Sequence, residues 1–118
     1  MIRVKKVERK AVWIMCFLFI LFDVVASLTT YIGITYLGLS EQNPFMAEMF
    51  AKHGIVPTLI VASLITFVLG VSVAIIGTHP RTWEKYSLPM FIDLAIFATI
   101  TLTDALGNII ALLSAVLR

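Results

Sequence analysis

Three long apolar runs constrain this chain more than any other feature. They cover residues 11–37, 55–77 and 89–117, and the middle run contains no charged residue. At about 1.5 Å per residue, each run forms a helix long enough to cross a hydrocarbon core about 30 Å thick. Only 14% of the 118 residues are charged, whereas a soluble domain has about 25%. The sequence therefore predicts an all-α integral membrane protein with a single domain, residues 1–118, and three transmembrane helices.

The positions of the basic residues predict the orientation of these helices. Five Lys and Arg residues lie in the tail 1–10 and two in the loop 78–88, while the other two are Lys52 and Arg118. Because basic residues concentrate on the cytoplasmic side, we expect a multi-pass protein of the cell membrane with its N-terminus in the cytoplasm and its C-terminus outside. The run 11–37 continues past Ala26, so we interpret it as a retained helix rather than a cleaved signal peptide.

The loop between the first two runs contains a helix of its own. Asn43 is a good N-cap, Pro44 suits the first helical position, and Gly54 suits the position after the last turn. Apolar and polar residues lie on different faces of the segment 43–53. This pattern is typical of a short amphipathic helix that lies at the outer membrane interface.

Small residues follow one face of the second and third apolar runs. A residue without a large side chain lets two helix backbones approach, which is the usual way in which membrane helices pack. We therefore predict that these faces form the helix contacts of a tight bundle. The predicted packing residues are Ala62, Thr66, Gly70, Ala74, Gly107 and Ala111.

Two aspartates lie deep in predicted membrane helices. Asp23 and Asp104 are roughly 17 and 22 Å along their helices from the inner boundary, and no Lys or Arg lies in any of the three runs. An aspartate at the centre of a membrane costs about 2.5–3.5 kcal/mol on insertion scales. Each is either a neutral, structural hydrogen-bond donor, or part of a proton site, a cation site or a polar ligand pocket. The sequence leaves these alternatives open.

Polar residues near these aspartates extend the candidate site toward the outer side. At 100° per residue, several of them share one face of the first or third helix, and two more lie in the following loop. The predicted ligand or ion-binding residues are Asp23, Ser27, Thr30, Glu41, Asn43, Asp104 and Asn108. We assign no catalytic residue and no cofactor, because the chain has no HExxH or CxxC motif, Gly-rich phosphate loop or nucleophile elbow. A metal is neither predicted nor excluded.

The stretch from Asp23 to Pro44 resembles a family of small, largely archaeal, three-span membrane proteins of unknown function. The residues that carry the resemblance are spaced as Asp…Thr…Gly-x-x-Glu-x-Asn-Pro, followed by a short amphipathic piece and a glycine. In this chain they are Asp23, Thr29 or Thr30, Gly38, Glu41, Asn43, Pro44, Phe45, Met46 and Gly54. The family often has a lysine early in the second span, and this chain has none between Gly54 and Pro80. The resemblance covers about half of the chain and implies a shared fold rather than an activity.

These observations favour a small integral membrane protein with a buried acidic cluster. It would act as an accessory subunit or scaffold, or bind a proton, a cation or a small polar ligand. The alternative is a compact proton-coupled transporter or channel subunit, and an intramembrane enzyme is the third possibility. Besides the lipid bilayer, we expect as partners other copies of the chain or a larger membrane complex, and no nucleic acid.

Overall fold

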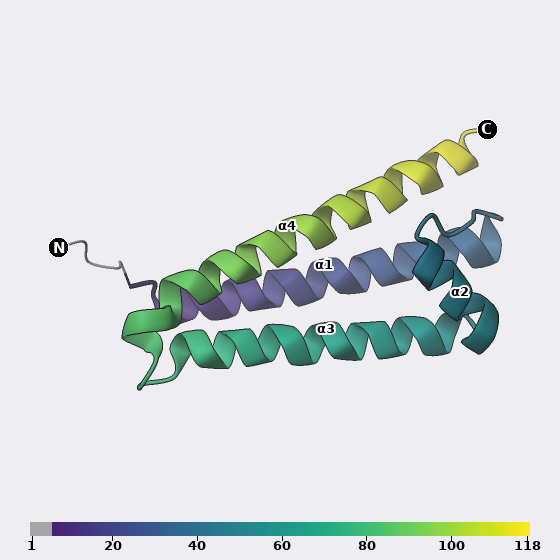
Figure 1. Cartoon of the computed structure of the whole chain (residues 1–118). Coiled ribbons are helices and arrows are strands. Elements are labelled where there is room, and N and C mark those ends of the chain that lie inside the picture. Colours follow the sequence, from purple (N-terminus) through teal and green to yellow (C-terminus); the bar gives the residue numbers. More distant parts are fainter. Residues whose placement is uncertain (1–5) are drawn as a thin grey trace.

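A computed structural model describes residues 6–118, and every regular element in this range is a helix. The tail residues Arg3 and Lys5 lie outside the described residues. Three of the helices, α1, α3 and α4, are long and apolar enough to cross a membrane. The elements shown in Figure 1 are α1 (Arg9–Tyr36), α2 (Pro44–His53), α3 (Ile55–Thr78) and α4 (Trp83–Val116).

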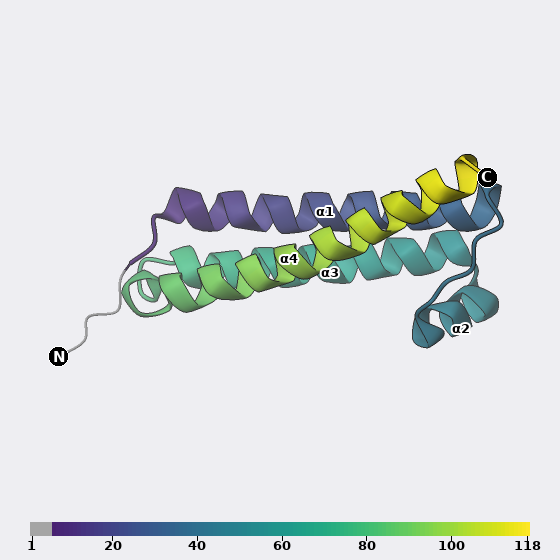
Figure 2. The same cartoon turned by 90° about the horizontal axis from the view of Figure 1, so that it is seen from above.

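The three long helices form a bundle in which each contacts the other two. α1 and α4 are parallel to each other, and α3, which lies between them in the sequence, is antiparallel to both (Figure 1). α4 diverges from α3 toward its C-terminal end, and from above it leans toward α1 (Figure 2). α2 lies across one end of the bundle beside the start of α3, and the N-terminus lies at the other (Figures 1 and 2). We call these the α2 end and the N-terminal end.

The tightly packed core lies in the half of the bundle near the N-terminal end. Its side chains come from the first half of α1, the last half of α3 and the first half of α4. The buried core residues are Val12, Cys16, Phe19, Ala74, Leu94 and Ala98. Most large apolar side chains outside this core are exposed on the sides of the bundle, with Ile65, for example, 63% exposed.

Two glycines of α3 allow the closest helix contacts in this core. A Cβ atom added at Gly77 would lie 2.9 Å from Met90 Cβ, and one at Gly70 would lie 3.1 Å from Phe19 Cδ2. The first distance is shorter than real Cβ contacts, so α3 and α4 approach as they do only because residue 77 has no side chain. The small-residue face that the sequence predicts for α3 is therefore buried at Gly70, Ala74 and Gly77.

α4 begins at Trp83, six residues before the apolar run 89–117, and includes Pro89 in its second turn. Proline inside a helix removes a backbone hydrogen bond, so Pro89 alone would favour a helix that begins at or near residue 89. Contacts with the N-terminal segment instead hold the first turns together. The Trp83 Nε1 donates to the Val7 carbonyl at 2.8 Å, and the buried Ser87 Oγ accepts from the Val7 N–H at 3.1 Å.

Candidate functional site

An open pocket of about 680 Å³ lies in the other half of the bundle, toward the α2 end. Its walls come from the second half of α1, the first half of α3, the second half of α4 and the loop that leads into α2. The pocket is in this half because α4 diverges from α3 here (Figure 1), whereas the core closes the bundle at the N-terminal end. All seven predicted binding residues line it: Asp23, Ser27, Thr30, Glu41, Asn43, Asp104 and Asn108.

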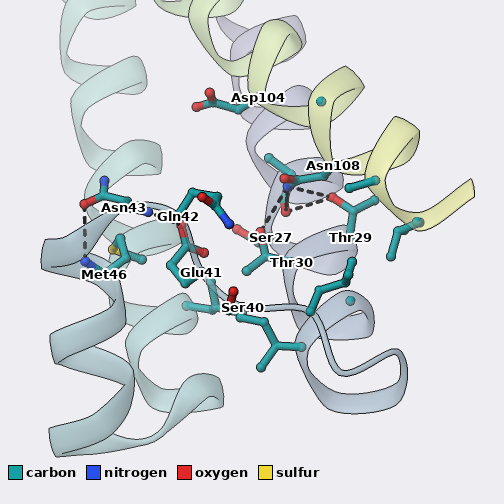
Figure 3. Close-up of a pocket in the computed structure, with 18 of the residues that line it drawn as sticks. Ser27, Thr29, Thr30, Ser40, Glu41, Gln42, Asn43, Met46, Asp104 and Asn108 are labelled. Carbon is teal, nitrogen blue, oxygen red and sulfur yellow. Dashed lines mark hydrogen bonds between the residues drawn. The ribbon is translucent and has the colours of Figure 1, made fainter. Parts of the chain in front are cut away.

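Asn108 ties the α4 wall of the pocket to the α1 wall. Its Nδ2 lies 3.0 Å from three acceptors on α1, which are the Ala26 carbonyl and the hydroxyl oxygens of Thr29 and Thr30 (Figure 3). The Thr29 hydroxyl donates to the backbone carbonyls of its own helix, so it is left to accept from Asn108. The Asn108 Nδ2 therefore links α4 to α1. Its Oδ1 has no hydrogen-bond partner within the described chain.

Asp23 faces α3 rather than α4. The hydroxyls of Ser63 and Thr66 on α3 lie near its carboxyl group. One turn further along α1, the Ser27 and Ser63 hydroxyl oxygens lie 3.2 Å apart. Thr66, predicted as a packing residue, thus lies half-buried beside a carboxyl group. The α1–α3 contact in this half of the bundle is polar, in contrast to the apolar contact at the N-terminal end.

Asp104 lies at the same level of the bundle as Asp23 but on a different wall. Asn108 contacts residues 26–30 of α1. Since α1 and α4 run in the same direction (Figure 1), Asp104, one turn before Asn108, lies level with Asp23, about one turn before those α1 residues. Asp104 is exposed and projects from α4 toward the side of the pocket on which α3 lies (Figure 3). Within residues 6–118 no hydrogen bond joins the two aspartates, so they face a common space without pairing.

The loop before α2 brings a third carboxyl group to the mouth of the pocket. The Glu41 Oε1 accepts from the Asn43 N–H at 3.1 Å. The Asn43 Oδ1 accepts from the N–H groups of Phe45 and Met46, and Figure 3 shows the bond to Met46. Asn43 is therefore the N-cap of α2 that the sequence predicts. These bonds order the loop and still leave one oxygen of Glu41 and the Asn43 side-chain NH₂ group without a recorded partner in the described chain.

The predicted packing residues near the pocket line it, and some of them are exposed rather than packed against another helix. Gly107 and Ala111 of α4 line the pocket and are exposed, and a Cβ added at Gly107 would meet no atom within 4 Å. Ala62 of α3 is half-buried on the opposite side. In this half of the bundle the small residues therefore widen a pocket instead of closing a helix contact.

The lining is acidic. It contains the carboxyl groups of Asp23, Glu41 and Asp104, and none of its residues is Lys, Arg or His. The three acids come from three different segments. In the part of the chain that the structure describes, no three His, Cys, Asp or Glu side chains are grouped closely enough to hold a metal ion. The charges are thus spread around the pocket rather than gathered at one point.

Sequence reasoning missed several polar residues of this site. Thr29 and Ser63 make hydrogen bonds across the helices, and Ser40, Gln42 and Thr103 also line the pocket. Helical spacing could have identified Ser63, because it lies on the same face of its helix as Ala62 and Thr66. Thr29 carried a weaker signal, as a hydroxyl next to Thr30 in the resemblance described above.

Comparison with known proteins adds no relative. No protein-family model, curated protein or solved structure matches the chain. The resemblance of the Asp23–Pro44 stretch to small three-span membrane proteins therefore stays an expectation from the sequence. The function has to be argued from the pocket and its residues.

Proposed function

We propose that this chain is a multi-pass membrane protein that binds a small polar ligand in the pocket at its α2 end. The three long apolar helices support insertion into a membrane. Among the described residues, five basic side chains lie at the N-terminal end of the bundle, and only Lys52 and Arg118 lie at the α2 end. This distribution supports a cell-membrane protein with a cytoplasmic N-terminus, so that the pocket opens to the outside.

The observation that carries the proposal is an open pocket with an acidic lining, part-way along helices that are long and apolar enough to cross a membrane. A carboxylate in a bilayer is costly unless it is paired or faces water, and such residues usually mark a functional path or site. In a purely structural seam, Asp23 and Asp104 would be buried against partners, and the helices would close around them. Instead Asp104 is exposed to about 680 Å³ of open space, a volume within the usual range of ligand pockets.

The shape of the pocket favours binding over conduction. The core formed around Val12, Ala74 and Leu94, each 0% exposed, closes the bundle at the N-terminal end. The pocket therefore reaches one end of the bundle only. A proton-coupled transporter or channel subunit is the second candidate, because Asp23 and Asp104 lie far from the ends of their helices. It would need a further conformation in which this core opens.

An enzyme has less support, because two of the hydroxyls that line the pocket are engaged in structural bonds. The Ser27 hydroxyl pairs with that of Ser63, and the Thr29 hydroxyl donates to its own helix. Neither is recorded in contact with a histidine or another general base. A role as an accessory subunit is compatible with ligand binding, since the sides of the bundle expose apolar surface on which other copies or other membrane proteins can pack.

A ligand screen with matched aspartate variants tests this proposal. The purified chain in lipid nanodiscs would be heated with a panel of small anionic, neutral and cationic solutes. We expect at least one solute to raise the unfolding temperature of the wild type and of Asp93→Asn, but not of Asp104→Asn. Asp93 is the control because it lies on the same helix and does not line the pocket. A panel without any stabilising solute, or shifts that Asp104→Asn leaves unchanged, would contradict ligand binding in this pocket.

A further inference from the structure

The acceptors left free in the pocket include all of its ionisable side chains. The Asn108 NH₂ group is used on α1, which leaves its Oδ1 as the free atom of that amide. The Thr29 hydroxyl proton goes to backbone carbonyls, and the Ser27 and Ser63 hydroxyls share a bond. The remaining acceptors include the three carboxyl groups. The pocket also holds free donors, such as the Asn43 side-chain NH₂ group, but its ionisable groups are all carboxyl groups, which favour a ligand rich in donors.

The charge of the lining favours a cationic donor. Three acids and no Lys, Arg or His line the pocket. Bonds between an ionised carboxylate and a cationic N–H are about twice as strong as neutral ones. A cation from outside would also supply the partner that Asp104 lacks within the described chain.

The size and spread of the site favour an organic cation over a metal ion. A calcium or magnesium ion needs several oxygen ligands that converge within about 2.0–2.6 Å of it. Here the acids lie on separate walls, and the described chain has no group of three metal-ligating side chains. The pocket also has apolar walls, formed by Ile34, Leu39, Met46, Leu59 and Leu112. These side chains suit the methylene groups of a carbon chain.

We propose that the pocket binds a small organic cation that carries two or more ammonium or guanidinium groups joined by methylene groups. One cationic group lies near Asp104 and another near Glu41 or Asp23, and the carbon chain contacts the apolar wall. This inference rests on the proposed function, because it names the ligand class of the same pocket.

Titration with three probes of similar length tests the ligand class. The probes are 1,4-diaminobutane, which is a dication, 1,4-butanediol, which is neutral, and succinate, which is a dianion. Binding to the full chain in nanodiscs would be measured by isothermal titration calorimetry. We expect only the diamine to bind. Asp104→Asn should weaken its binding about tenfold or more, and Asp93→Asn should leave it unchanged.

A second variant tests the same site without changing its charge. Ala111 lines the pocket and is exposed, so Ala111→Leu should fill space in the pocket without disturbing the core, and should also weaken diamine binding. Circular dichroism would establish that each variant is folded. If Asp104→Asn does not fold, Asp104→Glu takes its place, because it keeps the carboxyl group and should retain part of the affinity. Failure of the diamine to bind, or equal binding by all variants, would overturn the proposal. Binding of succinate or butanediol that Ala111→Leu weakens would also overturn it, but would leave the pocket as a ligand site.

Discussion

The Nδ2 atom of Asn108 lies 3.0 Å from the Oγ1 atom of Thr30, and this contact fixes how α4 sits on α1 beside the pocket. The same nitrogen lies 3.0 Å from the Ala26 carbonyl and the Thr29 hydroxyl. One side chain thus sets the register that places Asp104 level with Asp23. The pocket exists because α4 is held to α1 at this point while it diverges from α3 (Figures 1 and 3).

Loss of this contact should weaken the bundle measurably. Asn108→Ala removes the only donor recorded between α4 and α1 in the α2 half of the described chain. Interhelical hydrogen bonds in membranes contribute about 0.6 kcal/mol on average and up to about 1.7 kcal/mol, so we expect a loss of about 1 kcal/mol in the free energy of unfolding. Denaturation in mixed detergent micelles measures it. The control is Thr99→Ala, whose hydroxyl bonds only to the Ala95 carbonyl of its own helix. Equal stability of the two variants would count against a role for Asn108 in helix pairing.

Two glycine-to-alanine substitutions should have opposite effects. At Gly77 the new Cβ would lie 2.9 Å from Met90 Cβ, so α3 and α4 would have to move apart, at a cost of about 1–3 kcal/mol. At Gly107 the new Cβ would meet no atom within 4 Å. Gly107→Ala should therefore stabilise the helix by up to about 1 kcal/mol, since alanine favours a helix over glycine. The same denaturation assay compares them, and destabilisation of both variants to a similar extent would show that α4 packs at Gly107.

The parts of the fold that follow from local sequence patterns could be predicted, and the parts that depend on contacts between distant segments could not. The three apolar runs, the Asn43 cap and the small-residue face at Gly70 and Ala74 are local patterns, and each has its counterpart in the structure. The early start of α4 is not local, because Trp83 and Ser87 are held by bonds to Val7, far away in the sequence.

The candidate site shows the same division. Helical spacing grouped Asp23, Ser27 and Thr30 on one face of α1, and all three line the pocket. It did not show that Asp23 faces hydroxyls of α3 while Asn108 contacts Thr29 and Thr30. Those partners depend on how far each helix is rotated about its axis and on how α4 tilts. Both depend on contacts between segments that are far apart in the sequence, such as those of Asn108 with α1.

The cap of α2 gives a prediction for the mouth of the pocket. Asn43→Ala removes the acceptor of the Phe45 and Met46 N–H groups, and loss of such a cap costs about 1 kcal/mol. We expect faster amide hydrogen exchange in the first turn of α2 but unchanged exchange in α1, α3 and α4. Gln42→Ala is the control, because Gln42 lies next to the cap, is exposed and has no recorded hydrogen bond. Unchanged exchange in α2 of the Asn43 variant would show that the segment is held by other contacts.

The N-terminal end gives a prediction that is independent of the pocket. Trp83→Phe keeps the aromatic ring but removes the 2.8 Å bond from Nε1 to the Val7 carbonyl. The net loss of one hydrogen bond is about 1 kcal/mol, so a protease should cleave the segment around Val7 about fivefold faster. Trp13→Phe serves as the control, because Trp13 is exposed and its indole has no recorded hydrogen bond. Identical cleavage rates for both variants would show that the Trp83 bond does not hold this segment.

The most direct test of the central claim is the access of a polar reagent to the pocket from outside the membrane. Cys16 is buried in the core, so the wild type should not react with a membrane-impermeant maleimide added to intact cells. Ala111→Cys, which lines the pocket, should be labelled rapidly. Leu113→Cys lies two residues further on the exposed side of α4 and does not line the pocket, so the surrounding lipid should keep it unlabelled. Labelling of Ala111→Cys alone is the result we predict, and equal labelling of both variants, or of neither, would contradict a pocket that opens to the outside.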